Sequence, residues 1–489
     1  MNPMLPLSFV LLAVFAPDST VSDSSAPRDE DKLPKSNVKI TSKELSHHVH
    51  FLAGDELRGR KAGTEDAHRA ARYLVRALER AGFEPGGDDG TFLQRVPLRQ
   101  TVWTAPHQLT VHTDVEWDAE HGVDFSVRIN GLAKDTGRLT VAHVKEAGDV
   151  PEGANAEVAL LFHSRSSEMK SWLEAAGHED GEGFGLVMRV GGTTPGRSRG
   201  TMRSGGLQLP KGEIVDGVEE VTLRGKPGTE AEAIQWVDLK FHGGPEDVLD
   251  YNVVAKLPGV GTEEHPELKD EVVVLSAHYD HLGVRSRNAS GPEDGEDTIY
   301  NGADDDASGV ATVLEMAEAL GQAKERPART VYVLLAAAEE HGMLGTHYFA
   351  DNCPVDLTKI NCNLNFEMVG RPDETVGGPG QLWLSGFERS SLGPRLKELG
   401  IGVAEDMRPE QNFFARSDNI VFVQKGIVGQ TFSSYNMHDD YHQASDDPES
   451  LDYEHMEQAV RACFDAVRLV VDGEITPTWN EGEPNLGRR

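Results

Sequence analysis

The chain has 489 residues, 38% of them hydrophobic, and a formal net charge of −34 at pH 7. This length exceeds one typical domain, so we expect two or three folded units with enough apolar residues for packed cores. The strongly negative charge argues against a nucleic acid partner, because binding phosphates requires a basic surface.

The first predicted element is an apolar run from Leu5 to Ala16. It has the length of the hydrophobic part of a signal peptide and is too short to span a bilayer. Val14 and Ala16 form a small-residue cleavage pattern, and the residues that follow are polar. We therefore expect residues 1–39 to be a signal peptide with a flexible leader, and the protein to be secreted or periplasmic. No other stretch approaches the roughly twenty apolar residues of a membrane helix, so no stable membrane span is predicted.

Residues 40–100 have the apolar spacing of two helices. Leu45 and Val49 share one face of the first helix, and Leu74 and Leu78 share one face of the second. We expect this stretch to be the N-terminal helical part of the main domain.

Residues 101–245 have a different character, with short alternating or apolar runs separated by stretches rich in Gly, Thr and Ser. The runs at 109–113 and 158–163 are typical of strands. This pattern predicts an inserted, β-rich domain.

Residues 246–475 alternate between predicted strands and helices. The stretches 271–277 and 330–337 are continuous apolar runs typical of buried strands, and 309–320 predicts a helix. Such alternation indicates an α/β domain with a mostly parallel central sheet flanked by helices. In sheets of this kind, functional residues gather outside the carboxyl ends of the strands. Residues 476–489 are predicted to form a polar C-terminal tail.

The three cysteines are too few for a disulfide framework. Cys353 and Cys362 are close enough in sequence to form a bridge, but two buried free thiols are an equally good interpretation, and Cys463 has no neighbour in the sequence. None has the spacing of a metal ligand.

Histidine, aspartate and glutamate, the residue types that commonly bind metals, recur at the predicted strand ends. His278 and Asp280 directly follow the first buried strand, where Asp280 is a candidate acceptor for the second ring nitrogen of the histidine. Three consecutive aspartates, 304–306, open the predicted helix. They repel one another unless they are solvated, cap the helix or share a cation.

Further carboxylates and histidines follow along the chain. Glu339 and Glu340 come after the second buried strand, Glu367 interrupts an apolar segment, and the loop after residue 437 holds both His438 and His442. A buried charge is costly unless it is paired or binds a metal. The sequence does not choose between the two loop histidines, and His281, His341 and His347 are expected beside the site or on the surface.

This mixture of imidazole and carboxylate groups suits zinc better than calcium or magnesium, which prefer oxygen ligands alone. One bridging carboxylate could join two ions, and of two adjacent glutamates one could bind metal while the other handles a proton. The residues therefore predict a hydrolytic site with two zinc ions.

These motifs, in this order, resemble those of the zinc aminopeptidases of metallopeptidase family twenty-eight, which includes bacterial leucyl aminopeptidases and glutamate carboxypeptidases. The resemblance covers residues 252–472 and extends to the segment 51–64. It implies a zinc-exopeptidase type of α/β fold. The insert lies where several secreted relatives have a protease-associated domain.

The resemblance also implies a role for each residue. By this resemblance Glu339 is the general base, and Asp280 is the catalytic partner that orients His278. The implied ligands of two zinc ions are His278, Asp305 as the bridge, Glu340, Glu367 and His442, with His278, Asp305 and Glu367 around one ion and Asp305, Glu340 and His442 around the other. Family members commonly have Asp where this chain has Glu367.

From this resemblance we expect a secreted two-zinc aminopeptidase acting on peptides with a free N-terminus. The alternatives are a carboxypeptidase, a glutaminyl-cyclase-like enzyme, or a non-catalytic receptor or scaffold on the same fold. A receptor would have lost ligands or the base, whereas this chain retains all of them.

Overall fold

The computed structural model describes residues 39–484 except 104–107, 115, 121–123, 130–134, 165, 179–183, 191–206, 211–217, 224–230, 241–242 and 286–296. The expected signal peptide and nearly all of the leader lie outside the described residues, as does the end of the C-terminal tail, 485–489. Among the described helices none is long and apolar enough to cross a membrane.

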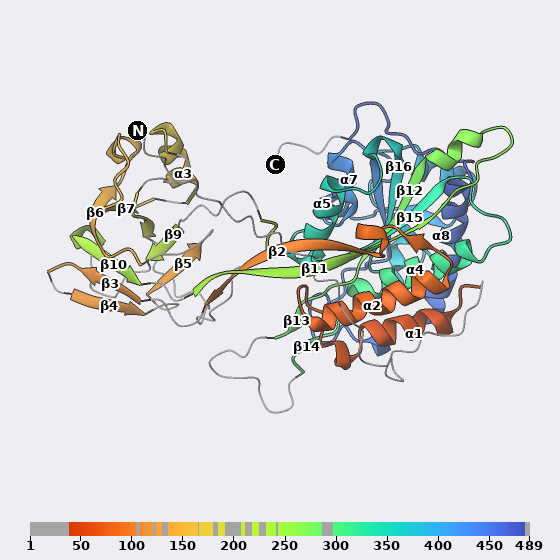
Figure 1. The fold of residues 1–489 in the computed structure, drawn as a ribbon, viewed down its shortest axis with the longest axis horizontal. Coiled ribbons are helices and arrows are strands. Elements are labelled where there is room, and N and C mark those ends of the chain that lie inside the picture. Colours follow the sequence, from red (N-terminus) through yellow and green to blue (C-terminus); the bar gives the residue numbers. More distant parts are fainter. Residues whose placement is uncertain are drawn as a thin grey trace, which may run out of the picture. The chain divides into compact units, whose positions relative to one another are not determined.

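A nine-stranded sheet forms the framework of the region that carries the predicted site (Figure 1). Its strands are β1 (Glu84–Pro85), β2 (Leu93–Trp103), β11 (Gly243–Leu257), β12 (Val272–His278), β15 (Thr330–Ala336), β16 (Ile360–Phe366), β17 (Leu382–Leu384), β18 (Val403–Glu405) and β19 (Val428–Ser433). The neighbouring strands β15, β12, β16 and β19 run parallel to one another, and β11, β1 and β2 pair in antiparallel fashion. The mostly parallel central sheet predicted from the sequence is confirmed.

Helices cover both faces of this sheet. They are α1 (Ser42–Leu52), α2 (Glu65–Arg80), α4 (Gly309–Gly321), α5 (Leu344–Asp351), α6 (Leu392–Glu398), α7 (Asn419–Gln424) and α8 (Tyr453–Val471). Val273 and Leu275 of β12 point into a core shared with α1, α2, α4 and α8. Val272 and Val274 point to the opposite side, where α5 and α7 pack. Successive residues of a strand face opposite sides, so a continuous apolar run is what a strand buried on both faces requires.

The two N-terminal helices begin where a side chain can cap them. The hydroxyl of Thr41 accepts a hydrogen bond from the N–H of Glu44, and Thr64 accepts one from Ala67. Leu45 and Val49 are buried in α1, and Leu74 and Leu78 are buried in α2, as their spacing predicts.

A second sheet is built from residues 108–240. Its eight strands are β3 (Gln108–His112), β4 (Glu116–Glu120), β5 (Phe125–Ile129), β6 (Arg138–Val144), β7 (Val158–Phe162), β8 (Leu186–Val190), β9 (Val218–Leu223) and β10 (Trp236–Lys240). Strands β6 to β9 are parallel, and the helix α3 (Ser166–Ala175) follows β7. The strand-rich character expected for this part of the sequence is present, whereas the exact domain limits stay predictions.

All three cysteines are free thiols in this fold, which decides the question that their spacing left open. Cys362 is fully buried, and burial raises the pKa of its thiol to about 12. Such a thiol is protonated and unreactive at neutral pH.

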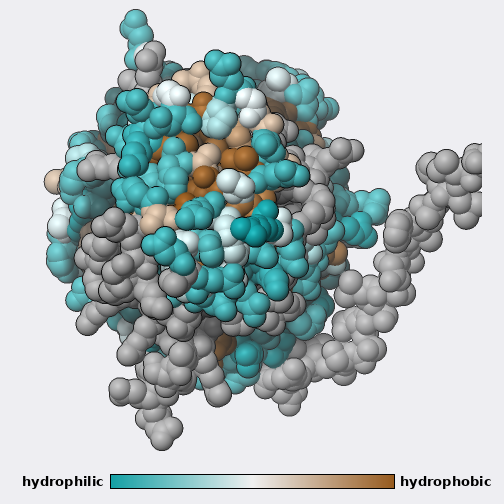
Figure 2. Space-filling model, turned by 90° about the vertical axis from the view of Figure 1, so that its left-hand side faces the viewer, coloured by the Kyte–Doolittle hydropathy of each residue, from teal (hydrophilic) through white to brown (hydrophobic). Residues whose placement is uncertain are grey.

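Charged groups account for 26% of the residues, and the surface reflects this. Figure 2 shows a mostly hydrophilic face on which hydrophobic residues gather in one area of its upper half. The hydrophilic surface agrees with the large net charge, which keeps proteins soluble.

The central position of β12 leads to a stability prediction. Leu275→Ala removes a side chain with 0% exposure and should lower the free energy of unfolding by about 2–5 kcal/mol. Val260→Ala is the control, because Val260 is 60% exposed and its truncation should change that free energy by less than about 0.5 kcal/mol. Urea unfolding followed by circular dichroism measures both, and equal stability of the two variants would contradict the predicted core.

Candidate metal centre

Three neighbouring parallel strands deliver the predicted site residues to one edge of the sheet. His278 is the last residue of β12, and Glu367 directly follows β16. Glu339 and Glu340 lie in a short helical turn, η8 (Glu339–His341), just after β15. The carboxyl ends of parallel strands meet at the same edge, which explains how residues far apart in sequence come together here.

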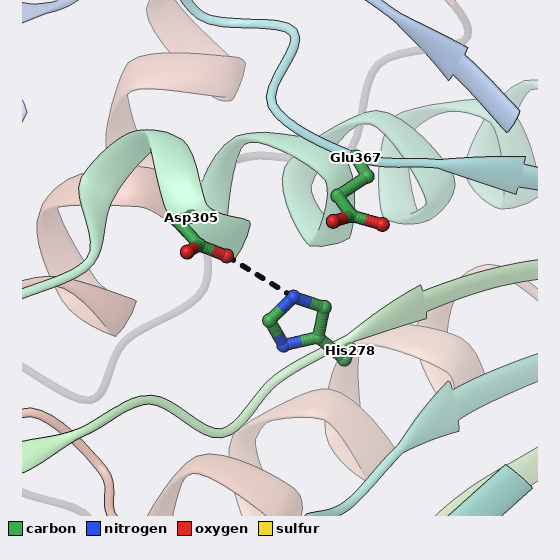
Figure 3. A group of neighbouring side chains, drawn as sticks. All are labelled: His278, Asp305 and Glu367. Carbon is green, nitrogen blue, oxygen red and sulfur yellow. Dashed lines mark ion pairs between the residues drawn. The ribbon is translucent and has the colours of Figure 1, made fainter. Parts of the chain in front are cut away.

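Asp305 occupies the centre of this group. It lies in the irregular turn η7 (Ala303–Ser308), which leads into α4. Its Oδ1 is 3.2 Å from Nε2 of His278, an ion pair drawn in Figure 3, and its Oδ2 is 3.1 Å from Nε2 of His442. The two oxygens of one carboxylate therefore face two different histidines, which is the arrangement expected of a carboxylate that bridges two ions.

The neighbouring aspartates have other partners. Asp304 accepts hydrogen bonds from the N–H of Gly370 at 2.7 Å and the hydroxyl of Ser308 at 3.1 Å. Asp306 accepts from the N–H groups of Gly309 and Met368 at 3.0 and 3.1 Å. Asp306 also accepts the backbone N–H of His278 at 3.3 Å. These carboxylates hold the loops around the site, and of the three Asp305 is the one that contacts the imidazole rings of His278 and His442.

One candidate metal group consists of His278, Asp305 and Glu367, whose potential ligand atoms all lie within 4.8 Å of one another. Figure 3 shows the three side chains converging from β12, η7 and the end of β16. This is the grouping expected for one of the two ions.

A second candidate group contains Asp305 and Glu340 with His281. His442 also approaches it, with its Nε2 3.2 Å from Oε2 of Glu340. His281 has 0% exposure, and its Nδ1 lies 2.7 Å from Oε1 of Glu340. The expected grouping names His442 as the imidazole, whereas the fold brings both histidines to Glu340. The only sequence signal for His281 is its place three residues after His278.

The two histidines of the loop after β19 have different partners. His442 faces Asp305 and Glu340, and His438 instead lies 3.1 Å from Oδ2 of Asp304. Tertiary structure thus distinguishes two residues that the sequence left equivalent.

Glu339 and Asp280 are linked through the backbone. Oδ1 of Asp280 accepts the N–H of Glu339 at 2.9 Å, and Oε2 of Glu339 lies 4.0 Å from Nε2 of His278. Nδ1 of His278 is 3.2 Å from the backbone carbonyl of Asp280 but 3.9 Å from its carboxylate. The carbonyl is therefore the nearer acceptor for His278, and the carboxylate of Asp280 positions Glu339 instead.

Burial and charge divide the carboxylates into two kinds. Burial raises the pKa of Glu339 well above its ordinary value and that of Asp280 to about 7. Burial and Asp305 also raise the pKa of Glu340, but His281 and His442 outweigh them and lower it to about 2. Contacts with His278 and His442 likewise overcome burial and hold the pKa of Asp305 well below its ordinary value. Burial therefore dominates at Glu339 and Asp280, whereas contacts with histidines dominate at Asp305 and Glu340.

The donor set fits zinc. Imidazole nitrogens and carboxylate oxygens are ordinary zinc ligands. Nε2 of His278 and Oε1 of Glu340 are buried and make no hydrogen bond of regular geometry, despite their short contacts. Buried polar atoms of this kind need another partner, and a cation in each of the two groups would supply one.

The backbone around the site is strained at several positions. Ala338, Met368 and His442 have φ angles of 55°, 53° and 57°, in the left-handed region that residues with a Cβ rarely adopt. Two of them adjoin the site glutamates 339 and 367, and the third is a site histidine. Strained residues concentrate at functional sites, where surrounding packing holds them in place.

Part of the chain matches a known protein family. Residues 252–467 match the model of peptidase family M28. This part of the chain is similar to members of that family. Every predicted ligand and both predicted catalytic residues lie inside the M28 region.

Two curated relatives match parts of the chain. A probable zinc metalloprotease of Leptosphaeria maculans is 35% identical over 139 residues, which are 28% of this chain and 28% of that protein. An aminopeptidase of Pseudomonas aeruginosa is 36% identical over 183 residues, 36% of this chain and 30% of that enzyme. The chain therefore matches less than a third of either relative's length.

A solved structure shows the same fold over a longer stretch. The aminopeptidase from Aneurinibacillus sp. strain AM-1 has a TM-score of 0.54 and covers 91% of this chain and 95% of its own, with 17% sequence identity. The likeness therefore concerns the fold.

The contrast between the two loop histidines gives a metal-binding prediction. We expect about two zinc ions per chain, because five ligating residues are too many for one tetrahedral ion. His442→Ala should weaken the binding of one ion by more than about 100-fold, since even a group that only orients a ligand contributes about 10–100-fold. His438→Ala, which removes an ion pair outside the two groups, should retain both ions. Elemental analysis after dialysis measures the zinc content, and equal loss in both variants would contradict the assignment.

Proposed function

We propose that the protein is a two-zinc aminopeptidase that hydrolyses the N-terminal peptide bond of peptides. The observation that carries the proposal is the position of Asp305, whose two carboxylate oxygens face His278 and His442 separately. This arrangement suits two ions sharing one carboxylate. The names of the relatives, a zinc metalloprotease and an aminopeptidase, support the same class of reaction.

In this proposal His278, Asp305 and Glu367 would hold one ion, and Asp305, Glu340 and His442 would hold the other. Two zinc ions held there would supply an activated water and polarise the scissile carbonyl. Glu339 accepts the proton of the attacking water and delivers it to the departing amine. The hydrogen bond from its N–H to Asp280 keeps its short helical turn in place.

A pocket beside Glu367 is suited to the side chain of the substrate's first residue. It is lined by Glu367, Met368, Trp383, Phe413, Arg416, Ser417, Thr431, Ser433, Tyr435 and Tyr441. Four of these ten residues are aromatic. Phe413 stacks on Trp383 with ring centroids 5.2 Å apart and contacts Tyr435 edge-on at 5.7 Å. Such a wall favours an apolar or aromatic N-terminal residue.

A carboxypeptidase is the second candidate. Such an enzyme would need a guanidinium that is available to bind the terminal carboxylate of its substrate. Arg371 does not fill this role, since it forms ion pairs with Asp440 and with Asp446, the latter at 3.2 Å. Arg416 is exposed, lines the pocket and lies 5.3 Å above the ring of Phe413. Arg416 could therefore bind the terminal carboxylate of a substrate, which is the observation that favours the carboxypeptidase alternative.

Export of the enzyme is a further part of the proposal. It is supported by the apolar run Leu5–Ala16, which has signal-peptide length. Peptides outside the cytoplasm would then be the substrates.

The role of Glu339 is tested by changing each of the paired glutamates to glutamine. Glu339→Gln should lower kcat by about two to four orders of magnitude with unchanged zinc content, because an amide cannot accept the proton. Glu340→Gln should lower zinc content together with activity. If Glu339→Gln kept near-normal turnover, the base would have to be another group.

The end of the substrate that is recognised is tested with matched peptides. An enzyme that reads a free α-ammonium should release N-terminal residues one at a time from an unblocked apolar peptide and leave its acetylated form intact. Mass spectrometry of the products distinguishes the two ends. Release of C-terminal residues first, abolished by Arg416→Ala, would establish the carboxypeptidase alternative instead.

A further inference from the structure

We propose that Arg60 is a positioning residue of the metal centre, whose guanidinium fixes the backbone of the two segments that carry His278 and Asp305. The proposal rests on the proposed zinc site and adds to it a residue outside the M28 match. Arg60 lies in the segment between α1 and α2, more than 200 residues before the first predicted ligand.

The guanidinium is fully buried, with 0% exposure. Its Nε donates to the carbonyl of Tyr279 at 2.7 Å, and its Nη2 donates to the carbonyl of Gly302 at 2.7 Å. Its Nη1 donates to the carbonyls of Asn301 and, at 3.0 Å, Leu52. An arginine has five N–H donors in a rigid plane. Here they make four hydrogen bonds to three separate pieces of backbone, which are Leu52, Tyr279 and the pair 301–302.

Two of the carbonyl acceptors belong to the two segments that carry site residues. Tyr279 is the residue between His278 and Asp280, and Gly302 is three residues before Asp305. One rigid group therefore sets the distance between the end of β12 and the turn η7. That distance decides whether His278 and Asp305 can share an ion.

The backbone of the Arg60 segment is inserted between the same two pieces of chain. Gly283 donates its N–H to the carbonyl of Gly59 at 3.1 Å, and Lys61 pairs with His281 as an isolated parallel bridge. Gly59 has φ +68°, and a Cβ there would lie 2.3 Å from the carbonyl oxygen of Tyr300. This close approach explains why the segment needs glycine beside Arg60.

The charge of Arg60 also suits this position. Its own burial lowers its pKa, while Asp280, Asp305, Asp306 and Asp446 act in the opposite direction. The guanidinium stays protonated in proteins. It therefore places one fixed positive charge behind a group of buried carboxylates.

A second buried arginine provides a matched control. Arg329 is 1% exposed and donates to the carbonyl of Ile475 at 2.9 Å, to that of Val470, and to the carboxylate of Glu271 at 2.7 Å. It is anchored as thoroughly as Arg60, but none of these partners belongs to the metal centre. A general stability effect should therefore be shared by both arginines, and a positioning effect should be confined to Arg60.

The test compares Arg60→Lys with Arg329→Lys, because lysine retains the charge but cannot span three backbone pieces. Zinc affinity is measured by competition with a chelator, and site geometry by the absorption spectrum of the cobalt-loaded protein. We expect Arg60→Lys to bind zinc about 10–100-fold more weakly, with an altered cobalt spectrum. Arg329→Lys should lower the melting temperature with zinc affinity within about twofold of wild type.

Wild-type zinc affinity and an unchanged cobalt spectrum in Arg60→Lys would overturn the proposal, as would an equal loss of affinity in Arg329→Lys. If Arg60→Lys does not fold, Asn301→Ala decides. The side chain of Asn301 donates to the carbonyl of Ala53 at 2.7 Å and ties the same segments together. Weakened zinc binding in that variant supports the proposal, and unchanged binding overturns it. These readouts need no peptidase activity, and a wild-type protein that bound no zinc would instead refute the proposed function.

Discussion

Buried carboxylates repel one another, and the region that carries the site is organised around this constraint. Glu339 and Glu340 follow the end of β15, Glu367 follows the end of β16, and Asp305 lies in the turn η7 beside them. All four side chains are largely shielded from solvent. In such surroundings an unpaired negative charge is expensive, so each carboxylate has to be protonated, hydrogen-bonded or neutralised by a cation. At the central carboxylate, Asp305, the negative charge is partnered by the imidazole rings of His278 and His442.

The fold meets this constraint by giving most other acidic groups backbone partners. Asp304 and Asp306 accept N–H groups from the loop after β16, and Oδ2 of Asp446 accepts the N–H groups of Asp304 and Asp305 at 3.0 and 3.1 Å. Hydrogen bonds to the charged form stabilise a carboxylate without using a metal. The same hydrogen bonds hold η7 against the edge of the sheet. They therefore both stabilise the charged carboxylates and position Asp305 in the site.

Chemical differences between neighbouring residues follow from their surroundings. Glu339 and Glu340 are adjacent in sequence, yet the pKa of Glu339 is raised by burial and that of Glu340 is lowered to about 2 by His281 and His442. A raised pKa makes a carboxylate a better proton acceptor, and a lowered pKa suits a carboxylate that stays ionised beside a metal. The short turn η8 separates them by pointing adjacent side chains at different partners.

Local patterns in the sequence predicted several of the elements and the clusters of candidate site residues. Continuous apolar runs predicted β12 and β15, helical spacing predicted α1, α2 and α4, and the clusters of His, Asp and Glu fell at strand ends. These features depend on residues close together in the chain, so they can be read without knowing the fold. Tertiary structure decided what depends on distant residues: that His442 rather than His438 faces Asp305, that His281 reaches Glu340, and that the carbonyl of Asp280 is the nearer acceptor for His278. It also decided the place of Arg60, because a buried arginine that binds backbone carbonyls has no pattern of its own until the chain around it has folded.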